Sequence, residues 1–332
     1  MPATAQAIRL DPWAAEYEGS IQIGEEIEPA SVDLTVEQDE WTAVRPGARK
    51  APPRIAFVDG VRRIEHRILV GEGNGTVFGL LGSFGVGCVR VDAAAINAAG
   101  RAQRSAKVGH EVLGRVMVIG GGLKPDPFVA CVPGGNALRF EPRSEPENDP
   151  AVPVQGLQKA MRQTEAGLAE RLSAEVDVVF LDGPLTFLTV AARGAVVGFV
   201  KRLLRNYLDA SAQALLPRLA VGERTPVFLI GGRDPRYSWY LRIAHGRAIE
   251  SELTGVARLE APAARGLDEA LKLADLSARV LPRFASDAAR DPRAPQNLYP
   301  IGGLEARLKH RLGDPAVVRH AIEAQLTSEV TA

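Results

Sequence analysis

The chain has 332 residues but only two cysteines, Cys88 and Cys131, and it lacks any long apolar run. Two cysteines are too few for a disulfide framework, so we expect a protein of a reducing compartment, the cytoplasm. A membrane-spanning helix needs roughly 18–20 consecutive apolar residues, and no segment provides them. The first residues also lack the basic and apolar regions of a signal peptide. We therefore expect a cytoplasmic protein without a membrane segment.

The sequence also has no net charge, because 40 basic residues balance 40 acidic ones. Binding to nucleic acid would therefore depend on local basic patches and not on the overall field. Zinc-ligand spacing, a P-loop, a dinucleotide fingerprint and a nucleophile elbow are all absent from the sequence. The composition, with 46% apolar residues, 33 glycines and 23 prolines, is typical of a folded protein with many loops.

The first half of the chain contains the clearest strand patterns. Residues 1–50 are polar, and we expect them to form an N-terminal extension or linker before one domain over 51–332. Apolar runs at 54–60, 61–70 and 76–92 predict a meander of antiparallel strands, because their connections are too short for crossover helices. The charged, proline-rich stretch at 139–156 predicts an exposed loop, and the apolar stripe over 157–175 predicts a helix.

The second half alternates strand and helix patterns. Strands are expected at 177–183 and 195–202, a helix at 203–219, a strand pair at 225–232 and 238–245, and mostly helix from 267 onward. Periodicity alone predicts a mixed α/β or α+β domain. Three antiparallel strands, an excursion, a helix and then strands alternating with helices is the order of an RNase H-like mixed sheet.

Two aspartates end apolar strands and are each followed by glycine, Asp59 in FVDG and Asp182 in VVFLDG. Asp-Gly is a common turn dipeptide, so both could be tight turns. Alternatively, two carboxylates at neighbouring strand ends could hold a divalent cation together. Both interpretations remain open from the residues alone.

Glu165 has an unusual position in the predicted helix. It lies four residues after Met161 and three before Leu168, so it lies beside the apolar stripe and faces the sheet. A buried carboxylate needs compensation, which a metal ion or a neighbouring arginine could supply.

Basic residues gather at two further places. Lys201 ends a predicted strand and, with Arg202 and Arg205, could hold a phosphate; the alternative is a lysine whose stem packs while its amine reaches solvent. Basic and aromatic residues alternate over 233–247, which suits single-stranded nucleic acid, although such strands also enter cores. The candidate contacts there are Arg236, Tyr237, Trp239 and Arg242.

Six segments in a fixed order resemble the NurA nuclease family. They are FVDG (57–60), AMRQTEAGL (160–168), VVFLDGPL (178–185), VGFVKR (197–202), SWYLRI (238–243) and NLYPIGGLEARLKH (297–310). The resemblance covers residues 54–312 and implies an RNase H-like nuclease that uses Mn²⁺ or Mg²⁺. It further implies 5′-to-3′ exonuclease and single-strand endonuclease activity on DNA ends, single- or double-stranded. A homodimer acting in DNA end resection with the hexameric ATPase HerA is also implied.

The resemblance assigns roles to five residues of this sequence. It makes Asp59 and Asp182 the metal-binding aspartates, Glu165 the acidic ligand between them, Lys201 the holder of the scissile phosphate, and His310 the C-terminal histidine. On the residues alone, His310 is expected to be a surface helix residue and not a ligand, because nothing near it in the sequence indicates a site.

Two positions depart from the family pattern. Val61 and Pro184 stand where hydroxyl residues are usual, directly after the two Asp-Gly pairs. A second hypothesis is therefore a catalytically weakened subunit that binds DNA or regulates the ATPase. A third is another RNase H-like nuclease, such as a resolvase or an RNA-cleaving enzyme.

Overall fold

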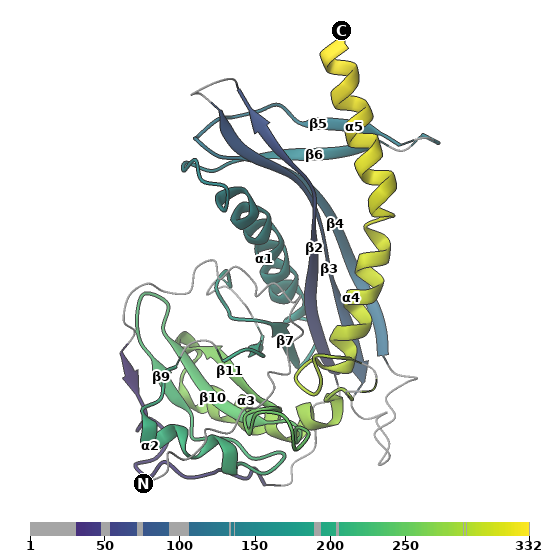
Figure 1. Cartoon of the computed structure of the whole chain (residues 1–332). Helices are drawn as coiled ribbons and strands as arrows, with labels where there is room; N and C mark the ends of the chain where they lie inside the picture. The colour runs from purple at the N-terminus through teal and green to yellow at the C-terminus, as the bar shows by residue number, and fades with distance from the viewer. Residues whose placement is uncertain are drawn as a thin grey trace, which may run out of the picture.

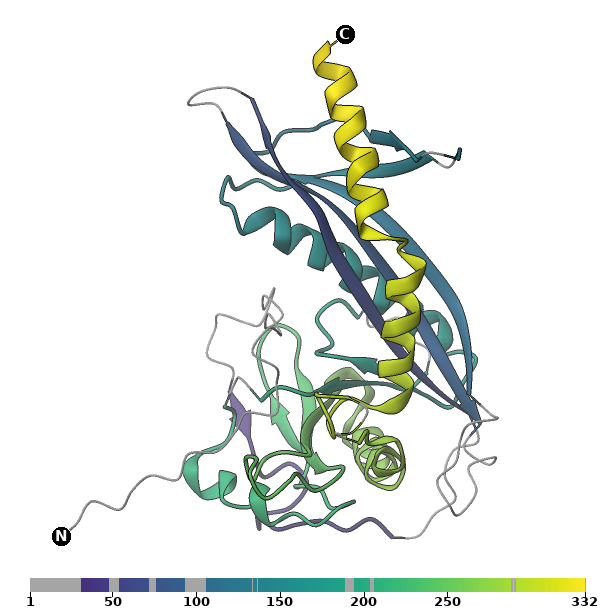
Figure 2. The ribbon, with the colours of Figure 1, turned by 45° about the vertical axis from the view of Figure 1, so that its right-hand side comes forward.

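Strands β2 (Arg54–Val70), β3 (Val77–Asp92) and β4 (Ala106–Ile119) form a long antiparallel blade, which has helices on both faces (Figures 1 and 2). The structure is a computed structural model that describes residues 31–47, 54–71, 76–92, 106–132, 134–135, 137–188, 194–203, 206–287, 289 and 291–331. Helix α1 lies on one face of the blade, and α4 and α5 lie on the other. No helix within the described ranges is long and apolar enough to cross a membrane.

One sheet contains all of the strands in the described ranges, in the order β1-β9-β10-β11-β8-β7-β2-β3-β4-β6-β5. Their bounds are β1 Val32–Asp33, β2 Arg54–Val70, β3 Val77–Asp92, β4 Ala106–Ile119, β5 Phe128–Cys131, β6 Ala137–Ser144, β7 Val178–Asp182, β8 Val196–Val200, β9 Phe228–Ile230, β10 Arg236–Arg242 and β11 Val256–Pro262. Strands β2, β3 and β4 pair antiparallel, whereas β7 runs parallel to β2, and β8 runs parallel to β7. The expected mixed sheet is therefore present.

The helices are α1 Val152–Leu172, α2 Ala210–Gln213, α3 Leu267–Val280, α4 Tyr299–Arg311 and α5 Pro315–Thr331. Apolar side chains of α3 and α4 pack on one face of the central strands, around Phe57, Phe180 and Phe199. Leu157 and Leu168 of α1 pack on the other face. The C-terminal part is helical, as the sequence predicts.

The prediction of two separate strands at 54–60 and 61–70 is wrong, because β2 is one continuous strand. Its partner β3 pairs with it from Arg54 through Val70, so Asp59 and Gly60 do not form a turn. Glycine is needed at position 60 for another reason. A Cβ there would lie only 2.5 Å from Glu165 Oε1, so its absence lets α1 approach the strand closely.

Two other expectations are wrong, and one strand was missed. The exposed loop expected at 139–156 contains most of β6 and the first turn of α1. The helix expected at 203–219 is reduced, in its described part, to α2 and a 3₁₀ turn at Leu216–Arg218, since Asp209 caps α2 and Pro217 interrupts further winding. Strand β11 carried no recognised signal in the sequence but fills the sheet between β8 and β10.

The described part of the N-terminal segment packs against the sheet. Strand β1 pairs with β9, and the Trp41 indole donates to the carbonyl of Ala212 at 3.0 Å. Glu37 accepts two hydrogen bonds from the buried Arg224, at 2.8 and 2.9 Å. Residues 31–47 therefore contribute to the fold, while the domain boundary at residue 50 stays a prediction.

Candidate metal centre

Asp59 and Asp182 lie side by side, because β2 and β7 are parallel neighbours in which Val58 pairs with Leu181. β7 ends at Asp182, where Gly183 adopts φ +102°, a conformation that favours glycine. β2 instead continues to Val70. The two carboxylates therefore meet at the point where one strand stops and its neighbour runs on.

A third carboxylate, Glu305, reaches the same point from α4. Carboxylate oxygens of Asp59, Asp182 and Glu305 all lie within 4.8 Å of one another. The sequence interpretation missed Glu305, although the signal was present. Glu305 lies four residues after Ile301 and three before Leu308, which is the spacing that drew attention to Glu165.

Glu165 is fully buried on α1, beside this group of three. Its Oε2 accepts a hydrogen bond from Arg162 at 2.9 Å, and Arg162 also donates to the backbone carbonyl of Asp182. Glu165 Oε1 is buried and has no hydrogen-bond partner among the described residues. The same is true of Asp59 Oδ2. Two buried carboxylate oxygens thus lack the partners that such groups normally have.

Lys201 follows β8 and lies within the centre. Its Nζ donates to Asp182 Oδ2 at 2.5 Å and to Asn297 Oδ1 at 2.6 Å. Asn297 in turn donates to Asp291 at 2.5 Å. Asp291 also pairs with Arg293, which in turn pairs with Glu305. The segment from Asp291 to Asn297 therefore supports both Lys201 and Glu305.

Burial and like charge raise the pKa of Asp59 well above the usual aspartate range, with Asp182 the largest charge contribution. Burial also raises the pKa of Glu165, although Arg162 counteracts it. Burial works to lower the pKa of Lys201, but the carboxylates of Asp182, Asp59 and Glu305 outweigh it and raise the pKa. Ionisation of all these carboxylates together is therefore unfavourable in this poorly solvated place unless a cation compensates their charge.

The charges of the described residues leave room for a divalent cation. Five carboxylates (Asp59, Glu165, Asp182, Asp291 and Glu305) and three cations (Arg162, Lys201 and Arg293) gather here, so two negative charges remain when all are ionised. Carboxylate oxygens are the ligands that Mg²⁺ and Mn²⁺ prefer. The unpartnered oxygens of Asp59 and Glu165 add to this fit. The residues present therefore suit a hard divalent cation.

His310 is exposed on α4, and the structure does not bring it to the three carboxylates. It lies five residues after Glu305, which turns it well away from the buried face of the helix. Of the charged groups expected near the aspartates, Glu165 and Lys201 do lie close to them. Glu305, not His310, is the residue of α4 that joins the cluster.

Trp239 and Arg242 do not fit their predicted role as nucleic-acid contacts. The Trp239 ring is fully buried, and its indole donates to Ser277 Oγ at 3.0 Å. Arg242 is buried and donates to backbone carbonyls, including that of Thr254 at 3.0 Å. Both side chains build the core around β10, so they offer no surface to a base or phosphate.

The remaining candidates for nucleic-acid contact that the structure describes lie nearer the surface. Arg236 is half-buried and pairs with Glu260 at 3.3 Å, and Tyr237 is also half-buried. Arg202 is half-buried just after β8, whereas Arg205 lies outside the described residues.

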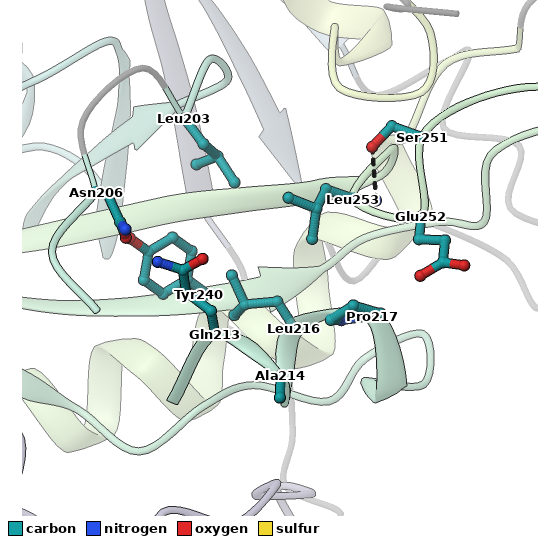
Figure 3. A pocket seen from close by; sticks show the side chains of 10 residues that line it. All are labelled: Leu203, Asn206, Gln213, Ala214, Leu216, Pro217, Tyr240, Ser251, Glu252 and Leu253. Atoms are coloured by element: carbon teal, nitrogen blue, oxygen red, sulfur yellow. Dashed lines mark hydrogen bonds between the residues drawn. The ribbon is translucent and has the colours of Figure 1, made fainter. Parts of the chain in front are cut away.

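A separate cavity of about 650 Å³ lies beside β10, and Figure 3 shows its lining. Tyr240 and Leu216 are among its apolar walls, and Asn206 and Gln213 lie near the Tyr240 ring. None of the lining residues belongs to the carboxylate cluster. This cavity is therefore not part of the candidate metal centre.

No protein-family model matches the sequence. No curated protein matches it either. Among solved structures, the chain is similar to the NurA nuclease from Sulfolobus solfataricus, with 12% sequence identity and a TM-score of 0.45. The match covers 88% of this chain and 87% of the other.

Proposed function

We propose that the chain is a divalent-metal-dependent DNA nuclease of the NurA type, with an RNase H-like fold. The observation that carries the proposal is the convergence of Asp59, Asp182 and Glu305 from three elements, with carboxylate oxygens within 4.8 Å. The excess negative charge and the unpartnered oxygens support a cation at this point. The sequence resemblance supplies the substrate class, DNA ends.

In this proposal, Asp59, Asp182 and Glu305 hold the cation, with Glu165 beside them. Bound Mn²⁺ or Mg²⁺ would supply an activated water and stabilise the leaving 3′ oxygen. Lys201 donates to Asp182 at 2.5 Å, and its ammonium lies where it can donate to a phosphate oxygen once Asp182 is otherwise neutralised. Arg162 fixes the backbone of Asp182 and the orientation of Glu165.

The decisive test is cleavage of labelled single- and double-stranded DNA with Mn²⁺, Mg²⁺ or EDTA. We expect wild type to cut with either metal and not in EDTA. The Asp59→Asn variant should lose at least about 100-fold in rate, because a ligand is lost from a metal that stabilises the transition state.

The matched control is Asp177→Asn, the same chemical change at the other end of β7, where Asp177 pairs with Arg54 at the surface. It should cut like wild type. Metal-dependent cleavage that survives in Asp59→Asn, or wild type that cuts nothing with either metal, would contradict the proposal.

A second candidate, a DNA-binding or ATPase-regulating subunit without catalysis, is favoured by one observation. Lys201 and Arg293 already pair with Asp182 and Glu305, so two of the three carboxylates have partners without a metal. This candidate predicts DNA binding and ATPase stimulation with no cleavage. A third, another RNase H-like nuclease, predicts preferential cleavage of RNA or branched DNA in the same assay.

The finer properties of the NurA type are part of the proposal. They are 5′-to-3′ exonuclease and single-strand endonuclease activity, a homodimer, and partnership with a HerA-type hexameric ATPase in end resection. End-labelled substrates report polarity, light scattering reports the mass in solution, and co-purification with the ATPase reports the partnership.

A further inference from the structure

A cavity of about 700 Å³ lies at the elbow between α4 and α5, and basic side chains line it. Its walls include Arg62 and Arg63 from β2 and Lys309 and His310 from α4. The elbow itself, Leu312 to Pro315, forms the remainder. We refer to this cavity as the elbow cavity.

Strand β2 connects the elbow cavity to the candidate metal centre. Arg62 follows Asp59 by three residues on the same continuous strand, which corresponds to about 10 Å at about 3.3 Å per residue. β7 pairs with β2 only as far as Val58, so beyond Asp59 the β7 side of β2 is not covered by β7. The strand thus leads from a carboxylate to two arginines, of which Arg62 donates from its Nε to Gln158 Oε1 of α1 at 2.6 Å.

Helix α4 makes the same connection independently. Lys309 and His310 follow Glu305 by four and five residues, which is about 6–8 Å along a helix. Both side chains are exposed, and no hydrogen bond or ion pair to a described residue engages either. Two elements that each carry a ligand of the candidate metal centre therefore each deliver basic groups to one cavity.

The remaining contacts define which charges face the cavity. Arg63 donates to the carbonyl of Gly313 at 2.8 Å and pairs with Glu65 at 2.9 Å, so it braces the elbow. Asp314 accepts from the backbone N–H of Ala316 at 2.8 Å and caps α5. The ammonium of Lys309 is therefore the positive charge that is available to a ligand in the cavity.

We propose that the elbow cavity binds a second phosphate of the DNA strand, within about three nucleotides of the phosphate at the carboxylates. The inference rests on the proposed function for its substrate. It gives His310 and Lys309 a role in holding the strand, at a distance from the reacting phosphate. Such a site fixes the register of the strand without touching the bond that breaks.

The test uses end-labelled single-stranded oligonucleotides that carry one neutral methylphosphonate at each position beside the cleaved bond. For wild type, we expect one position to raise KM about fivefold while kcat stays the same, since one charge-assisted contact is lost. Lys309→Ala should show this higher KM with the fully charged strand, and no further rise from the methylphosphonate. Lys272→Ala, an exposed lysine of α3, is the charge-matched control and should behave as wild type.

Equal methylphosphonate effects in wild type and Lys309→Ala, or a loss of kcat in Lys309→Ala with KM unchanged, would overturn the inference. Failure of the proposed function gives a different result, namely no cleavage by wild type. In that case the same oligonucleotides are measured by fluorescence anisotropy in EDTA. A position whose methylphosphonate weakens binding by wild type but not by Lys309→Ala would still support the elbow cavity, and its absence would refute it.

Discussion

Lys201 acts as an internal counter-ion in this fold. It is buried beside Asp182 and Asn297, and its ammonium neutralises part of the negative charge that Asp59, Asp182 and Glu305 create. A metal ion that neutralises the same carboxylates would therefore compete with Lys201 for Asp182. This competition makes Lys201 a determinant of metal affinity as well as a phosphate donor.

We predict that Lys201→Met lowers the stability of the metal-free protein by about 3 kcal/mol, because the partly buried Asp182 loses its ionic partner. Added Mn²⁺ should then raise Tm more in the variant than in wild type. Thermal unfolding in EDTA and in excess Mn²⁺ measures both effects. Lys159→Met, which removes a surface lysine that pairs with Glu145 at 3.8 Å, should change neither quantity. Equal Mn²⁺-induced shifts in Lys201→Met and wild type would contradict the competition.

At the scale of elements, the close approach of α1 to β2 at Gly60 positions Glu165. A Cβ at residue 60 would lie 2.5 Å from Glu165 Oε1 and 2.9 Å from Met161 Cγ. Glu165 is fully buried, so it cannot move aside into solvent. The absence of a side chain at Gly60 therefore fixes how closely α1 approaches β2, and with it the position of Glu165.

We predict that Gly60→Ala destabilises the protein by about 1–3 kcal/mol through overpacking, and weakens Mn²⁺ binding by displacing Glu165. Gly303→Ala is the control, because a Cβ at this position in α4 would meet nothing within 4 Å. Alanine there should stabilise the helix by about 0.5–1 kcal/mol. Urea unfolding and Mn²⁺ titration calorimetry measure the two quantities. Mn²⁺ affinity that stays at the wild-type value in Gly60→Ala would separate Glu165 from the centre.

At the scale of the whole molecule, the buried Glu260 joins β11 to the turn after β7. Its Oε1 accepts the backbone N–H of Leu185 at 2.7 Å, and its Oε2 accepts from Arg258 at 2.5 Å. Burial opposes ionisation, but Arg258, Arg236 and the N–H of Leu185 outweigh it and lower the pKa of Glu260. Its ionised form is therefore favoured more in the folded than in the unfolded chain.

The sign of the pH dependence follows from this lowered pKa. Glu260 contributes stability above the glutamate pKa of the unfolded chain, about 4.3, and this contribution is lost as pH falls through the lower folded value. We predict that Glu260→Gln costs about 3–5 kcal/mol at pH 7, since Arg258 stays buried without its carboxylate. Its stability should then fall less steeply than wild type below pH 4.3, about the unfolded value. Urea unfolding from pH 7 to pH 3 measures this, with the exposed Glu252→Gln as control; parallel profiles would contradict it.

How far the sequence predicts this molecule is clearest from its two Asp-Gly pairs. Asp182-Gly183 does end a strand, with Gly183 at φ +102°, whereas Asp59-Gly60 continues within β2. The dipeptides are identical, and the difference comes from partners distant in sequence. β3 pairs with β2 on both sides of Gly60, whereas the pairing of β7 with β2 stops at Leu181 and its pairing with β8 stops at Asp182.

The carboxylate centre was also predictable only in part, because local sequence patterns do not indicate contacts between elements that are distant in sequence. Apolar runs predict that Asp59 and Asp182 lie in strands of the sheet, and helical spacing predicts that Glu165 faces the sheet. Glu305 has the same spacing in α4, but the contact of α4 with β2 is a tertiary one that periodicity does not indicate. The burial of Trp239 likewise depends on α3, which is why its alternation with arginines was misleading.

The length of β2 has one more consequence. Its first residues, such as Phe57, belong to the core that supports the carboxylates, whereas Ile68 and Val70 pack with β5, β6 and α5 in a separate apolar cluster. The two ends of β2 are thus packed in two different apolar clusters. Protection of backbone amides from hydrogen exchange should therefore differ between the two ends of β2. Loosening the end that contains Ile68 and Val70 would leave the carboxylates in place.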